Sequence, residues 1–138
     1  MNSSAQAFIE RLQRGDIRYM EDAQPDGSHY VAVEVAGKSG KLFNIAMVFS
    51  ADGSEFGMRC YKLGQVPTER VRPMLKVLNQ LNGDFAWVRF FIDNEQEVAA
   101  ALDAIITPAS APRVCWEMLV RMFSVLDEAQ EKIHDVLK

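Results

Sequence analysis

The sequence is poor in the residues from which metal centres and disulfide scaffolds are built. Its 138 residues include two cysteines and two histidines. Cys60 and Cys115 lie far apart, with no second cysteine or histidine at a zinc-binding spacing. Because a free cysteine usually behaves as a small hydrophobic residue, we expect two buried, reduced thiols. The sequence predicts no metal and no cofactor.

Long apolar runs and an excess of positive charge are also missing. The longest apolar runs fall well short of the roughly 20 residues that a membrane-spanning helix needs. Glu10 and Arg11 interrupt the N-terminal segment where a signal peptide would be apolar. A net charge of −4, with no basic run interleaved with aromatic residues, opposes attraction to nucleic acid or to an anionic membrane. We therefore expect a cytoplasmic protein that binds neither nucleic acid nor membranes.

The residues that are present have the composition of an ordinary globular protein, with 49% hydrophobic and 25% charged residues. A chain of this length suits one domain, here residues 1–138, and such a domain buries roughly 70% of the surface of its unfolded chain. Its core can therefore form without support from a metal or a disulfide.

The first half of the chain predicts one short helix followed by strands. Residues 4–14 have an amphipathic helical pattern that Ser3 or Ser4 can cap. Alternation of apolar and polar residues then predicts a short strand at 16–22. Three longer strands follow, separated by turns that contain glycine, at residues 29–36, 42–49 and 56–63.

The strand at 42–49 is apolar on both faces, unlike its neighbours. An antiparallel strand with one face in water should alternate cleanly between apolar and polar residues. This strand therefore needs cover on both faces, from helices of the same chain or from a second subunit. It is one of two reasons to expect a homodimer.

Residues 67–93 are the stretch around which the second half is organised. They predict a helix, a tight break at 82–84 and an aromatic strand at 85–92. Pro73 is tolerated only in the first turn of a helix, so the regular helix begins near Arg72 or its first turn is loose. The apolar stripe of this helix is expected to consist of Val71, Leu75, Leu78 and Leu81.

The last third contains one ambiguous segment and one clear helix. Residues 98–106 favour a helix by their alanines, but after a short polar turn they also suit the returning arm of a hairpin. A loop is expected between Pro108 and Pro112. Residues 113–138 have apolar positions at steps of three and four. The first half of this helix is apolar nearly all round, which predicts burial on several sides and is the second reason to expect a homodimer.

Two motifs have an ordinary structural explanation. Gly37-Lys38-Ser39 is similar to the end of a phosphate-binding loop, but Ala32 stands where the motif needs glycine and a strand follows, so we expect a hairpin turn. The acidic residues at 93–97 lack the glycine and the glutamate of a calcium-binding EF-hand loop, so we expect a solvated turn.

His29 opens a predicted strand and follows a turn that contains Ser28. General-base catalysis needs a histidine within hydrogen-bond reach of a nucleophile. His29 with Ser28 or Ser50 is the pairing that the sequence leaves open. A small enzyme with residues assembled from distant parts of the chain is therefore one hypothesis.

Trp87, Arg89 and Phe91 are the candidate protein-binding residues. In a regular strand at 85–92 they alternate onto one face. Aromatic residues and arginine are enriched in interaction hot spots, which favours a binding surface. The alternative is that the aromatic rings lie under a helix while Arg89 extends its charge to the rim.

The second half of the chain resembles the YbjN family. The resemblance rests on a helix that ends in LNQLN, the aromatic strand FAWVRFFID, the acidic turn DNEQEV and the final helix MLVRMFSVLDEAQEKI. The family has the element order α-β-β-β-α-β-β-α, often with an additional short strand early in the chain, and is similar in fold to type III secretion chaperones. The resemblance thus implies an α+β fold with an antiparallel sheet and a long C-terminal helix, in which residues 98–106 form a strand.

The same resemblance implies binding rather than catalysis. The family has no known catalytic residues, and its members are described as sensory-transduction or stress-related regulators. The chaperones of similar fold are acidic homodimers that bind extended segments of client proteins. We therefore expect a non-enzymatic, homodimeric protein-binding or regulatory domain with a protein partner. A type III secretion chaperone and a small enzyme are the alternatives.

Overall fold

The structure of the chain is a computed structural model that describes residues 2–138. Three helices and six strands follow one another along these residues in the order that the family resemblance predicted. They are α1 (Ser3–Arg14), β1 (Met20–Ala23), β2 (His29–Ala36), β3 (Leu42–Phe49), β4 (Glu55–Gln65), a 3-10 turn η1 (Thr68–Arg70), α2 (Val71–Asp84), β5 (Arg89–Ile92), β6 (Glu97–Ile105) and α3 (Ala111–Leu137).

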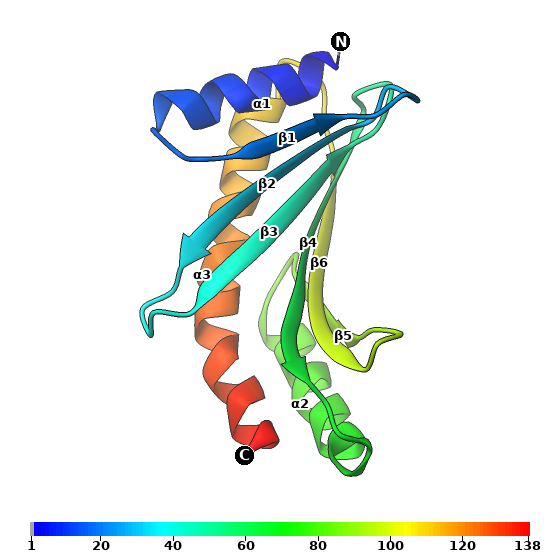
Figure 1. The fold of residues 1–138 in the computed structure, drawn as a ribbon, viewed down its shortest axis with the longest axis vertical. Coiled ribbons are helices and arrows are strands. Elements are labelled where there is room, and N and C mark those ends of the chain that lie inside the picture. Colours follow the sequence, from blue (N-terminus) through cyan, green and yellow to red (C-terminus); the bar gives the residue numbers. More distant parts are fainter. Residues whose placement is uncertain (1) are drawn as a thin grey trace.

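The six strands form one antiparallel sheet in the order β1-β2-β3-β4-β6-β5 (Figure 1). Strands β1 to β4 form a meander, and β6 then pairs with β4, which leaves the short strand β5 at the far edge. The predicted α+β fold, the early short strand and the strand at 98–106 are confirmed. The alanines of that segment favour a helix, but the segment forms a strand because every residue from Val98 to Leu102 is buried in the sheet, where it packs against neighbouring strands and side chains.

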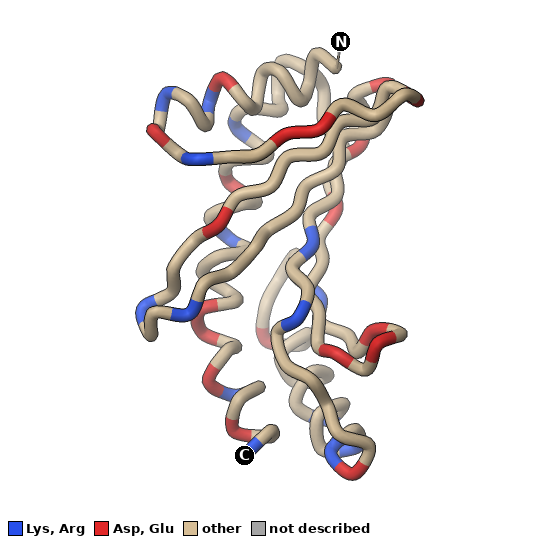
Figure 2. Tube along the Cα trace, viewed as in Figure 1, with Lys and Arg blue, Asp and Glu red and all other residues tan. Residues whose placement is uncertain are grey.

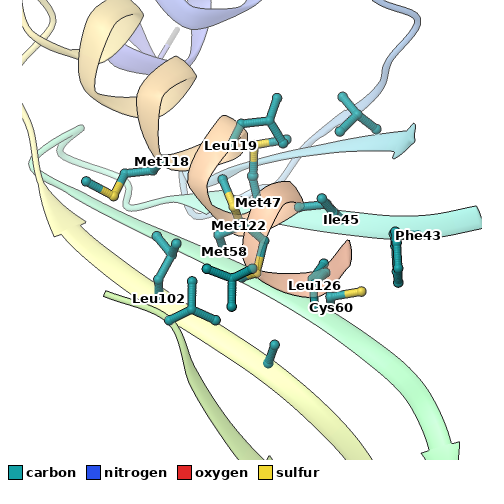
Figure 3. Close-up of a cluster of buried hydrophobic side chains, with 14 of the residues drawn as sticks. Phe43, Ile45, Met47, Met58, Cys60, Leu102, Met118, Leu119, Met122 and Leu126 are labelled. Carbon is teal, nitrogen blue, oxygen red and sulfur yellow. The ribbon is translucent and has the colours of Figure 1, made fainter. Parts of the chain in front are cut away.

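All three helices contribute to the core on one face of the sheet. In β3, Phe43, Ile45, Met47 and Phe49 are buried, whereas the residues between them are exposed. Phe8 of α1 packs against Phe49, with ring centroids 6.0 Å apart. Figure 3 shows α3 crossing the same face, with its side chains directed at those of the strands. Of the two sources of cover that the sequence left open, helices of the same chain cover only one face of β3, and its other face is open in the single chain.

The apolar first half of α3 is accounted for largely within the chain. Cys115, Met122 and Leu126 are buried against the sheet, and α1 packs on the same helix. Further along α3, the carboxylate of Asp127 accepts a hydrogen bond from the backbone N–H of Lys38 at 3.1 Å. The Gly37-Lys38-Ser39 segment is therefore a hairpin turn docked on α3, as expected, and not a phosphate-binding loop.

The N-terminal prediction needs two corrections. Asn2 caps α1, since its side-chain oxygen accepts from the N–H of Ala5 at 3.1 Å. The expected cap Ser4 is fully buried and donates to the carbonyl of Gly53 at 2.6 Å. The first strand is shorter than the predicted 16–22, because Ile17 and Tyr19 pack against the core and strand pairing begins at Met20.

Helix α2 differs from its prediction at its end and in its buried stripe. Its start is as expected: the first turn is the 3-10 turn η1, and Pro73 lies in the first turn of the regular helix. The expected break at 82–84 is wrong, because the helix continues to Asp84. Met74 is buried in place of Leu75, which is 51% exposed. Pro112 is also helical, in the first turn of α3 rather than in a loop, a position that suits proline.

Candidate binding surface

One face of the sheet is not covered by the helices of the chain. Strand register identifies its residues, because directly paired residues of antiparallel strands point to the same side. One row crosses all six strands, and its pairs are Met20 with Ala32, Ala32 with Ala46, Ala46 with Arg59, Arg59 with Ala101 and Ala101 with Arg89. We call the side that carries this row the open face.

Large apolar side chains are exposed on the open face. Tyr30 and Val48 pair with each other across β2 and β3 and are 46% and 38% exposed. Large exposed apolar patches on the surface of a protein mark sites of interaction with other molecules. Further members at its margins are Met20, Leu42, Tyr61, Phe91 and Ile105.

A charged cluster lies within this apolar surface, where β4, β6 and β5 pair. The carboxylate of Asp103 bridges two arginines, with one oxygen 3.0 Å from Arg59 Nη1 and the other 3.1 Å from Arg89 Nη2. Arg59 also donates to the carbonyl of Leu102 at 3.1 Å, so its guanidinium is held against the sheet. Arg89 has Asp103 as its one ion-pair partner among residues 2–138, and its side chain is 53% exposed.

The ionisation of Asp103 responds to both arginines. Partial burial acts to raise the pKa of the carboxyl group, but hydrogen bonds and charge from Arg59 and Arg89 outweigh it and hold the pKa below its ordinary value. Asp103 is therefore a carboxylate at neutral pH. Two arginines and one carboxylate leave the cluster with one positive charge in excess.

Small residues separate the larger groups of the cluster. Ala99 and Ala101 of β6 belong to the open face, yet neither is accessible to solvent. Arg59 and Arg89 pair with Ala101 from opposite sides, and Phe91 pairs with Ala99. The long side chains thus lean over the alanines. The result is a compact aromatic and cationic surface rather than separate protruding side chains.

Trp87 lies next to this surface but not in the strand where the sequence placed it. Strand β5 begins at Arg89, so the prediction of a strand at 85–92 is wrong in its first half. The N–H of Val88 donates to the carbonyl of Ala86 at 2.9 Å, and Trp87 between them has φ +74°. This is a γ-turn of the rare, strained type. Trp87 is 61% exposed and belongs to the turn that leads into β5.

Of the three predicted residues, Arg89 and Phe91 share the open face, and Trp87 lies beside them in the turn at the border of the sheet. Phe91 is 36% exposed. Sequence reasoning missed Arg59, Tyr61 and Asp103. Their place beside Arg89 depends on β6 pairing with β4, which no local pattern in the sequence reveals.

The edge of β5 is closed by a side chain. Asn82 of α2 accepts from the N–H of Phe90 at 2.7 Å and donates to the carbonyl of Phe90 at 3.1 Å. Both backbone groups that Phe90 would offer to an additional strand are thereby occupied. Asn82 therefore protects the edge of β5 at Phe90 against pairing with another strand.

The alternative sites of the sequence are not assembled. His29 Nε2 lies 3.3 Å from Glu21 Oε1 without hydrogen-bond geometry. The hydroxyls of Ser28 and Ser50 donate to aspartates of their own turns. Among residues 2–138, no group of three His, Cys, Asp or Glu side chains could hold a metal ion, and no helix is long and apolar enough to cross a membrane.

The architecture is an α+β fold with a one-sided antiparallel sheet, in which three helices cover one face and a mixed aromatic and charged surface occupies the other. By sequence, no known protein family and no curated protein matches the chain. By structure, the chain is similar to YbjN from E. coli, a proposed transcription regulator, with a TM-score of 0.58, 14% sequence identity and coverage of 93% of this chain and 92% of that chain. It is also similar to a chain of the heterodimeric ExoU-SpcU complex from the type III secretion system of Pseudomonas aeruginosa, with a TM-score of 0.47, 15% identity and coverage of 92% and 94%. The chain has a YbjN-like fold, which confirms the resemblance.

Proposed function

We propose that this chain is a non-enzymatic protein-binding domain of regulatory type, a single cytoplasmic domain that acts by presenting the open face to a protein partner. The observation that carries the proposal is the combination of exposed aromatic rings with the Arg59–Asp103–Arg89 cluster on one uncovered sheet face. A few residues supply most of the binding energy of a protein interface, and aromatic residues and arginine are enriched among them, particularly where neighbouring contacts exclude water.

Arg89, Phe91 and Trp87 are the residues proposed to dominate binding. Arg89 is exposed and forms one surface ion pair, so its guanidinium can turn from Asp103 toward a carboxylate of the partner. Phe91 and Trp87 present partly exposed rings on either side of it along the chain. Arg59 is held against the sheet and still pairs with Asp103 when Arg89 moves away.

A second copy of the chain is the other occupant that an observation favours. Leu42 and Val48 on the open face of β3 are 58% and 38% exposed, and burying such residues between two sheets would stabilise a homodimer. Light scattering at high micromolar concentration decides this point. A dimer mass that becomes monomeric in Val48→Asp supports it, and a monomer mass for the wild-type chain contradicts it.

The partner-binding proposal is tested with a matched pair of double variants. The wild-type protein is used to capture partners from the native cytoplasm, and each captured protein is then purified and titrated against the chain. We expect Arg89→Ala/Phe91→Ala to weaken that direct binding by about tenfold or more. The control, Leu75→Ala/Lys76→Ala, removes an exposed apolar residue and a positive charge from α2 and should leave binding unchanged. Equal binding by both folded variants would refute the proposal.

A further inference from the structure

A second feature lies on the helical side of the molecule, where α1 and α3 pack together. It is an open cleft of about 670 Å³ between the C-terminal half of α1 and the first turns of α3. Figure 2 shows basic positions on both segments at this crossing. The charged residues of its lining are Arg11, Arg14, Arg113 and Glu117.

The guanidinium of Arg11 is held over an aromatic ring. Its central carbon lies 3.8 Å from the centroid of the Trp116 ring, within the range of a cation–π interaction. A side chain at Gly15 would crowd this pair, because its Cβ would lie 3.3 Å from Arg11 Nη1 and 3.5 Å from the Trp116 ring. The stacked guanidinium keeps its N–H edge free for a bidentate carboxylate or phosphate.

The positive charge of the cleft is only partly balanced. Glu117 is shared by Arg113 at 4.0 Å and by Arg121 at 3.6 Å. Within residues 2–138, neither Arg11 nor Arg14 has a carboxylate within 4.0 Å. Three arginines and one glutamate give the lining a net charge of 3 − 1 = +2, in a chain whose net charge is −4. The cleft therefore attracts anionic groups although the whole protein repels them.

The rest of the lining is apolar and restricts the kind of anion. Pro112 and Val120 contribute to it, and Val120 is 51% exposed. A phosphate ion bound to the arginines would leave this apolar surface exposed to water. A nucleotide base would find one face of Trp116 already covered by Arg11. Carboxylates on either side of an apolar side chain satisfy both parts of the lining.

We propose that this cleft binds a segment of a partner protein in which acidic side chains flank a large apolar one. The site is separate from the open face and does not depend on the function proposed for that face.

Fluorine NMR of the chain labelled with 5-fluorotryptophan tests the proposal, since the two tryptophans report on different surfaces. Trp116 lines the cleft and Trp87 borders the open face, and Trp87→Phe assigns the two signals. The probe is a blocked peptide with a central leucine flanked on each side by glutamates. We expect saturable movement of the Trp116 signal alone. Peptides with glutamine in place of glutamate, or glycine in place of leucine, should bind at least about tenfold more weakly.

Charge reversal supplies the matched variants. Arg14→Glu/Arg113→Glu should weaken peptide binding at least about tenfold, whereas Arg72→Glu/Lys76→Glu makes the same charge change on exposed positions of α2 and should not. If the first variant unfolds, Arg14→Gln/Arg113→Gln replaces it. An unmoved Trp116 signal, undiminished binding by the folded cleft variant, or displacement of the peptide by equimolar inorganic phosphate would each overturn the proposal. Movement of the Trp87 signal alone would overturn it while favouring the open face.

Discussion

Replacing Asn82 with alanine should loosen the edge of the sheet that carries Arg89 and Phe91. The side chain of Asn82 forms two hydrogen bonds with the backbone of Phe90, at 2.7 and 3.1 Å. Hydrogen bonds of this kind contribute about 0.5–1.5 kcal/mol each to stability, so the loss of both costs about 1–3 kcal/mol. Alanine offsets part of that loss, because its helix propensity exceeds that of asparagine by up to about 0.7 kcal/mol. With the full propensity gain, the expected net destabilisation is about 0.3–2.3 kcal/mol.

Asn79→Ala is the matched control for this prediction. Asn79 lies one turn earlier in α2, is exposed and has no side-chain hydrogen bond within residues 2–138. Its replacement gains the same propensity and loses no contact. The free energies of unfolding of the two variants, measured by urea denaturation, should therefore differ by about 1–3 kcal/mol.

Hydrogen exchange then locates the effect. The amide of Phe90 donates to Asn82 in the wild-type protein and should exchange faster in Asn82→Ala, while amides in the middle of β3 follow only the global change in stability. Two variants that differ by less than about 0.5 kcal/mol, with equal exchange at Phe90, would refute the view that Asn82 holds the edge strand.

Three further predictions concern close packing, pH and thiol reactivity. Gly37→Ala should destabilise the protein by about 1–3 kcal/mol, because its Cβ would lie 2.5 Å from the carboxylate of Asp127, which anchors the β2–β3 turn. Gly83 lies in helix α2, and a Cβ there would meet no atom within 4 Å, so Gly83→Ala should stabilise the protein by about 0.5–1 kcal/mol. Thermal unfolding measures both changes. The pKa of Asp103 is lower in the folded than in the unfolded chain, so its stabilising contribution is present above its ordinary pKa of 3.8 and is lost as the pH falls through the folded value. On acidification, the free energy of unfolding should therefore fall less for Asp103→Asn than for the wild type. An equal pH dependence of the two proteins would contradict the ion pairs. Burial raises the pKa of Cys60 to about 11 and that of Cys115 to about 12. Neither thiol should therefore react with iodoacetamide at pH 8 until urea unfolds the chain. Rapid labelling of the native protein would contradict this prediction, because it would show that a thiol is accessible.

The sequence by itself determined where most elements lie. Strands at 29–36 and 42–49 are found at the predicted residues, because alternating apolar side chains and the turns that follow them are local features. The last helix begins within two residues of its predicted start, since its apolar spacing continues over many turns. The strand at 97–105 followed from the family resemblance rather than from propensity, because its alanines carry a helical preference that neighbouring strands override.

The tertiary structure alone decided how the candidate surfaces are assembled. Trp87 lies before β5 in a turn with positive φ, a conformation that the pattern FAWVRFF does not predict because bulky residues rarely adopt it. Asp103 joins Arg59 and Arg89 only because β6 lies between β4 and β5. Strand order depends on which apolar faces pack together, and it decides which residues far apart in the chain come into contact. A local stretch of sequence carries no signature of such long-range pairing.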